Sequence, residues 1–130
     1  MEVRLYEPAK DYAMLCGWWD AWGWEAIPQN LLPKYGLVIK NEGVDTYAAF
    51  IYRTDSGLCL FDWFVSNKNA PVKLRRGGLD FLIKEGKGLA KRLGFAAVWC
   101  SVNDKGLIKK LETNGIDPND TNMTNLLGVL

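Results

Sequence analysis

The stretch from Leu58 to Val102 constrains the fold of this chain most strongly. An apolar and aromatic run at 58–65 is followed by a basic loop with two glycines at 66–78, and then by a helical pattern that Gly94 is placed to end. The apolar stripe of that helix consists of Leu79, Leu82, Ile83, Leu89, Ala90 and Leu93. The almost wholly apolar run at 96–102 predicts a strand covered on both faces. A strand, a helix and a second strand indicate a parallel pair joined by a right-handed crossover.

Two glycines interrupt the same helical pattern. Gly86 lies on the apolar stripe and Gly88 lies beside it. Each costs up to ~1 kcal/mol relative to alanine in a helix interior. Close packing of the helix on a sheet would account for both glycines, and local fraying would as well.

The sequence before this stretch predicts an antiparallel meander. The runs 37–40, 46–52 and 58–65 are β-branched and aromatic, and clusters of turn residues separate them. A short strand at 3–6 precedes them, followed by a helix that Asp11 is placed to cap.

Shorter elements are predicted elsewhere. Pro28 stands where a helix could begin, and Pro33 stands where that helix must end or bend. The apolar spacing at 107–111 predicts a short helix that stops at Asn114. The run MTNLLGVL at 123–130 predicts a last strand. The sequence therefore predicts a single α/β (α+β) domain with a mixed central sheet, in which an antiparallel meander precedes a parallel β-α-β crossover and helices cover both faces.

The charge balance excludes a strong global field. Sixteen Lys and Arg stand against fifteen Asp and Glu, so the formal net charge is +1. Such a chain is not drawn as a whole onto nucleic acid or anionic membrane. No apolar run approaches the ~20 residues of a membrane span, and the N-terminal residues lack a signal-peptide pattern. We expect a soluble, cytoplasmic protein that does not bind membranes.

Histidine is absent from the sequence, which removes serine–histidine and cysteine–histidine catalysis. A general base must then be a carboxylate, a tyrosinate, a lysine or a relayed water. Cys16, Cys59 and Cys100 are far apart and lack the spacing of a zinc site, so we interpret them as small core residues and expect no metal.

The loop at 66–78 has the composition of an anion site. It carries Lys68, Lys73, Arg75 and Arg76 ahead of Gly77 and Gly78. Glycine lets the backbone approach a phosphate closely, and the positive end of the helix dipole favours negative charge there. A solvated basic loop between a strand and a helix is the alternative interpretation.

The segment 58–116 resembles the acyl-CoA-binding half of the GNAT N-acetyltransferase family. The family loop reads Arg or Gln, two residues, Gly, one residue, then Gly or Ala, and Arg75, Gly78 and Asp80 stand at those three positions. The resemblance implies acetyl-CoA as cosubstrate, with cofactor contacts from Lys73, Arg75, Arg76, Gly77, Gly78 and Asn103. Aspartate replaces the last small residue, and the loop is longer than usual. Compact, divergent members with such a loop are similar to ones encoded by bacteriophages.

The family resemblance also assigns roles on the strand before the loop. In the family this strand splays from its neighbour, and backbone groups of Phe61 to Val65 would then be free for the pantetheine amides. A backbone N–H near Phe64 or Val65 would polarise the thioester carbonyl. Asp62 stands where some members carry a general base, although an ordinary strand carboxylate facing solvent is the alternative. Many members hold a proton-donating tyrosine at the position of Leu111, and leucine cannot donate a proton. Tyr47, Tyr52 or water would have to replace it.

Four of the six tryptophans cluster within seven residues: Trp18, Trp19, Trp22 and Trp24. In the family this region forms part of the acceptor pocket, where indole rings can contact a cationic amine. Trp19 and Trp22 match the helical stripe and are expected in the core. Trp18 and Trp24 are the expected substrate-binding residues.

Three functions are compatible with these patterns. The first is transfer of acetyl from acetyl-CoA to a primary amine of a small molecule or a protein. The second is a catalytically degenerate GNAT-like binding or regulatory protein, which the replacements at Asp80 and Leu111 favour. The third, single-stranded nucleic-acid binding through Trp63, Tyr47 and Tyr52, is disfavoured by the near-zero net charge. The sequence leaves the oligomeric state open, a dimer included.

Overall fold

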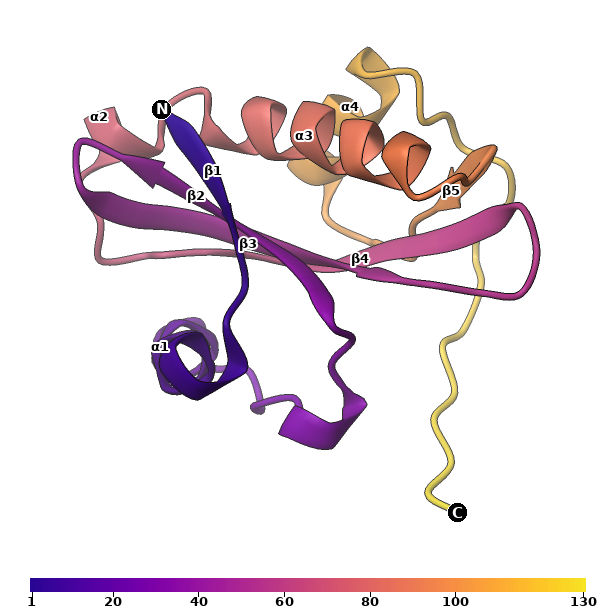
Figure 1. Ribbon diagram of the computed structural model, residues 1–130, viewed down its shortest axis with the longest axis horizontal. Helices are drawn as coiled ribbons and strands as arrows, with labels where there is room; N and C mark the ends of the chain where they lie inside the picture. The colour runs from indigo at the N-terminus through magenta and orange to yellow at the C-terminus, as the bar shows by residue number, and fades with distance from the viewer.

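The computed structural model describes residues 1–130 and contains one five-stranded sheet with helices on both faces (Figure 1). The strands are β1 (Glu2–Leu5), β2 (Tyr35–Asn41), β3 (Val44–Tyr52), β4 (Leu58–Ser66) and β5 (Ala97–Trp99). They lie in sequential order, with antiparallel pairing from β1 to β4 and a parallel β4–β5 pair. The predicted mixed sheet, meander and parallel crossover are confirmed.

The helices are α1 (Pro8–Ala21), α2 (Val72–Arg75), α3 (Gly78–Arg92) and α4 (Lys105–Thr113), with a 3-10 turn η1 at Gln29–Leu31. Helix α1 lies on one face of the sheet, whereas α3 and α4 lie on the other (Figure 1). None of the helices combines the length and apolar character that a bilayer crossing requires.

The two faces of the sheet bury separate hydrophobic clusters. On the α3 side the buried residues are Leu37, Ile39, Ala49, Ile51, Cys59, Phe61, Leu82, Leu89 and Ala90. On the α1 side they are Tyr6, Leu15, Trp18, Trp19, Val38, Ala48, Phe50 and Val65. Because strand side chains alternate between faces, the apolar runs of β2 and β3 supply both clusters. These two central strands are therefore buried on both sides.

Helix α3 packs closely on the sheet where it lacks side chains. A Cβ on Gly86 would lie 2.2 Å from Cζ of Phe61, and a Cβ on Gly78 would lie 2.6 Å from Cδ2 of Tyr47. Both separations are shorter than any carbon–carbon contact allows. The glycine in the apolar stripe is thus explained by close packing.

An ion cluster holds the N-terminal elements together. The Arg4 guanidinium donates to Oδ2 of Asp11 at 2.7 Å and to Oδ2 of Asp45 at 3.0 Å, which joins β1, α1 and β3. The prediction that Asp11 is the N-cap was wrong. Helix α1 begins at Pro8, and the Asp11 carboxylate inside its first turn accepts the Glu7 N–H at 2.8 Å.

The structure corrects three further predictions. The expected last strand at 123–130 is an extended, exposed segment, because β-propensity alone supplies no partner for the backbone groups. The apolar run at 96–102 yields only the three residues of β5, where Trp99 is 60% exposed, so this strand is not covered on both faces. The loop expected at 66–78 contains α2.

We predict opposite effects of two alanine substitutions in α3. Gly86→Ala should destabilise the protein by about 1–3 kcal/mol because the new methyl group displaces the Phe61 ring. Gly88→Ala, whose Cβ would meet only the flexible end of Arg92, should stabilise it by about 0.5–1 kcal/mol. Urea unfolding measures both. Equal effects of the two substitutions would contradict the packing at Gly86.

Candidate functional site

Strand β4 separates from β5 after the first third of its length. The parallel pairing covers Leu58 to Leu60, whereas β4 continues to Ser66. From Phe61 onward, one edge of β4 therefore has no neighbouring strand. A cavity of about 850 Å³ lies at this separation. Its wall includes β4, the segment after β5, the start of α4, and residues 124–127 of the C-terminal segment.

A β-bulge shapes the cavity side of β4. The register between β3 and β4 shifts between Ala48 and Phe50, and Trp63 has a φ of 59°. A non-glycine residue in this region costs about 1–2 kcal/mol. The bulge breaks the alternation of side chains, so that Phe61 and Phe64 pack on the α3 side with ring centroids 4.7 Å apart.

Hydrogen bonds hold the bulge in place. The Trp63 Nε1–H donates to the Tyr52 hydroxyl at 2.8 Å, and that hydroxyl donates to the Leu31 carbonyl oxygen at 2.6 Å. The Tyr52 proton is thereby committed to a backbone acceptor. Tyr52 is consequently a support for Trp63 rather than a free proton donor.

Asp62 is the carboxylate in the larger cavity whose pKa best suits a general base. It lines the cavity, and its Oδ1 accepts the Trp63 N–H at 2.9 Å. Burial raises the pKa of Asp62 to about 6, although backbone N–H groups oppose the shift. A carboxylate with this pKa ionises just below neutral pH, which suits a general base.

Cys100 behaves differently. Burial, together with the nearby charge of Asp62, raises the pKa of the Cys100 thiol to about 12. The thiol therefore stays protonated at neutral pH and is a poor nucleophile.

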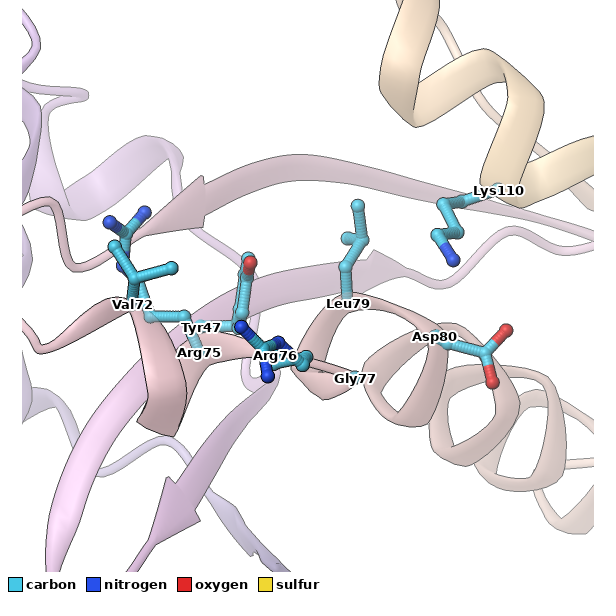
Figure 2. A pocket seen from close by; sticks show the side chains of 8 residues that line it. All are labelled: Tyr47, Val72, Arg75, Arg76, Gly77, Leu79, Asp80 and Lys110. Carbon is cyan, nitrogen blue, oxygen red and sulfur yellow. The ribbon is translucent and has the colours of Figure 1, made fainter.

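A smaller cavity of about 270 Å³ lies at the N-terminus of α3. It is lined by Tyr47, Val72, Arg75, Arg76, Gly77, Leu79, Asp80 and Lys110 (Figure 2). No side chain caps α3, whose N-cap Gly77 has a φ of 78°. The N–H groups of its first turn have no acceptor within the helix. Three cationic side chains and a helix N-terminus give this cavity the composition that favours an anion.

The Asp80 carboxylate is turned away from Arg75 and Arg76. It accepts the Asn114 Nδ2–H at 2.9 Å and pairs with Nζ of Lys84 at 2.9 Å. These interactions, that with Asn114 first, lower the pKa of Asp80. Figure 2 shows the carboxylate directed away from Arg76. Asp80 therefore ties α3 to α4, and its charge is partly neutralised before any anion approaches.

Most of the predicted site residues line one of the two cavities. The larger contains Asp62, Phe64, Val65, Asn103 and Trp24, and the smaller contains Arg75, Arg76 and Gly77. Two predicted cofactor residues line neither cavity. Lys73 is exposed on α2, and Gly78 is buried against Tyr47, where its missing Cβ serves packing.

The tryptophan predictions were partly reversed. Trp18 is only 7% exposed in the α1-side cluster and does not line the cavity, so its expected substrate contact is not supported. Trp22, expected in the core, is 36% exposed and lines the larger cavity. Helix α1 ends at Ala21, and the helical stripe therefore does not extend to Trp22.

Sequence reasoning missed Lys110, which reaches the smaller cavity from α4 (Figure 2). It also gave no cavity role to residues 124–127. Leu111, which replaces the family tyrosine, is 3% exposed, so α4 offers no proton donor at that position. Tyr47 lines both cavities, and burial raises its pKa while Arg75 opposes the shift.

No family model and no curated protein sequence matches the chain. Solved structures do match. The ribosomal-protein-alanine N-acetyltransferase from Brucella melitensis aligns with a TM-score of 0.68 and 10% identity, over 99% of this chain and 100% of that one. The aminoglycoside acetyltransferase meta-AAC0020, from an uncultured soil metagenomic sample, aligns at 0.67 and 17% identity, over 99% and 95%.

A third match is yncA from Salmonella typhimurium, solved with its cofactor acetyl-CoA. It aligns with a TM-score of 0.66 and 17% identity, over 88% of this chain and 78% of that one. At such identities the likeness concerns the fold. Together with the mixed sheet, the parallel crossover and the separation of β4 from β5, these matches show that the chain has the GNAT acetyltransferase fold.

Proposed function

We propose that this protein is an N-acetyltransferase that transfers acetyl from acetyl-CoA to a primary amine of a small molecule or a protein. The observation that carries the proposal is the continuity of an anion site with an apolar cavity. Tyr47 and Leu79 line both cavities, so one ligand can extend from the first turn of α3 to the separated edge of β4. A long molecule with a charged diphosphate and a thin amide-containing arm fits this combination.

The proposed binding residues form two groups, one for the diphosphate and one for the pantetheine arm of acetyl-CoA. The first-turn N–H groups of α3, with Arg75, Arg76 and Lys110, bind the diphosphate. Backbone groups near Phe64 and Val65, on the edge of β4 that β5 leaves, bind the pantetheine amides, and Asn103 closes the other wall. Residues 1–130 thus act as a single acyl-CoA-binding domain. The relative solved with acetyl-CoA as its cofactor supports this assignment.

Asp62 is the proposed general base. As a carboxylate it attracts the acceptor ammonium and takes one proton from it, directly or through water. The freed nitrogen bonds to the acetyl carbon while the carbon–sulfur bond breaks. The second proton lost by the nitrogen and the proton gained by the sulfur both exchange with water, because Leu111 is buried and carries none. The products are an amide and a free thiol.

The buried leucine also favours a second candidate function. A GNAT-like protein that binds acetyl-CoA without turnover would need the anion site and the apolar cavity but no proton donor. Binding without thiol release across a broad amine panel would select this function over the first.

We expect acetyl-CoA to raise the melting temperature, because a ligand that binds only the folded state stabilises it. Arg76→Ala combined with Lys110→Ala should weaken acetyl-CoA binding by about 10-fold or more, since each removes a charge-assisted contact. Lys91→Ala, a cation on the same helix α3 outside both cavities, should leave the shift unchanged. Absence of any shift at millimolar acetyl-CoA would refute the proposal.

The acetylation rate should rise with pH through about 6, where Asp62 loses its proton. Asp62→Asn should lower kcat by about 10²–10⁴-fold and abolish this step in the pH profile, with acetyl-CoA binding retained. Thiol release at pH 5 to 8 measures it. An unchanged profile in the variant would assign the base elsewhere.

The same substitution tests the burial of Asp62 without any substrate. Because its pKa rises from 3.8 to about 6 on folding, the folded state binds this proton more tightly, and that stabilisation is lost as pH rises through 6. Asp62→Asn should therefore stabilise the protein at pH 8 by on the order of 1–2 kcal/mol, and by roughly half as much at pH 5.

Thermal unfolding at both pH values measures this difference. Asp55→Asn, at an exposed carboxylate in the turn between β3 and β4, is the matched control and should change little. If both variants behaved alike, the raised pKa of Asp62 would be refuted.

A further inference from the structure

We propose that the acceptor is a monoamine joined to a flat aromatic group, with the ring held by Trp24 and Trp63 and the ammonium beside Asp62. This inference rests on the proposed acetyl transfer and names the substrate class of that site. It follows from the charges and the aromatic faces of the larger cavity.

The charged lining of the larger cavity is acidic and offers few partners to a polycation. Its only charged side chains are Asp62 and Asp104, and no Lys or Arg lines it. The Asp104 carboxylate is already engaged as the N-cap of α4, where it accepts the Leu107 N–H at 2.8 Å. Asp62 likewise accepts a backbone N–H, from Trp63 at 2.9 Å, and neither carboxylate is in a salt bridge. Asp62 is the more buried of the two and therefore gains more from an ammonium partner, whereas a polycation with three or more charges would leave some of them without partners.

Two indole rings are exposed at this cavity and held in fixed positions. Trp24 is 51% exposed and stacks on Trp22 with ring centroids 5.8 Å apart. Trp22 is itself anchored, because its Nε1–H donates to the Ser66 carbonyl oxygen at 2.9 Å and Lys68 Nζ lies 4.9 Å from its ring centroid. Trp24 therefore offers a supported aromatic surface.

Trp63 supplies the second ring. It is 44% exposed, and the hydrogen bond to Tyr52 fixes its indole. It follows Asp62 directly in β4, so a carboxylate and an aromatic face occur at neighbouring positions of one bulged strand. A cation held by both gains an ion pair and a cation–π contact.

Part of the remaining wall is apolar as well. Leu126 and Leu127 of the C-terminal segment line the cavity, although both side chains are more than four-fifths exposed overall. A flat apolar group that enters between the indoles and this segment would remove exposed apolar surface from water.

The test compares amines that differ in ring and in charge. Initial rates of thiol release would be measured with tryptamine and phenethylamine, with ethylamine as the ringless monoamine, with kanamycin and spermidine as polycations, and with an alanyl peptide. We expect kcat/KM for the two ring-bearing monoamines to exceed that of every other amine by 10-fold or more. Trp24→Ala should remove that preference by raising KM for tryptamine at least 10-fold more than KM for ethylamine.

Trp99→Ala is the matched control, because Trp99 is also exposed but lines neither cavity. It should leave the preference for tryptamine intact. Trp24→Phe, which keeps a flat ring, should retain most of the preference if Trp24→Ala unfolds the chain.

Several outcomes would overturn the inference. Equal kcat/KM for tryptamine and ethylamine, or an equal loss for both amines in Trp24→Ala, would remove the role of the ring. Acetylation of kanamycin or the peptide in preference to tryptamine would leave acetyl transfer standing with another substrate class. Failure of acetyl-CoA to bind, with no thiol release from any amine, would overturn both proposals.

Discussion

The approach of α3 to the sheet is the constraint on which the rest of the structure depends. At Gly86 the helix backbone lies against the Phe61 ring, and at Gly78 it lies against Tyr47, with no room for a Cβ at either position. The helix is thereby fixed to β3 and β4 at two points along its length. Its uncapped N-terminus opens at the smaller cavity as a result, and both halves of the proposed ligand share Tyr47 and Leu79 as a common wall.

Periodicity predicted the parts of the fold in which packing repeats. The stripe of α3 and the alternating runs of β2 and β3 are long enough for their period to identify both the element and its buried face. Prediction failed where an element depends on a neighbour that the sequence does not reveal. The run at 123–130 has strand-forming residues and no pairing edge, and the apolar run at 96–102 pairs over only three residues.

The sequence predicted those site residues that lie close to one another along the chain. Arg75, Arg76 and Gly77 lie together in one loop, and Asp62 lies in the strand just before it. Lys110 is more than thirty residues from that loop, and only the packing of α4 beside α3 brings it to the same cavity. The exchange of Trp18 and Trp22 has another cause, because the helical stripe was extended past the point where α1 ends.

The bulge at Trp63 makes the length of β4 as important as its composition. The residues before and after it are out of phase by one position, so Phe61 and Phe64 share a face while Val65 occupies the other. Insertion or deletion of one residue here would rotate every later side chain of the strand onto the wrong layer. Related chains should consequently vary in the loops on either side of β4 and keep the number of residues in the strand constant.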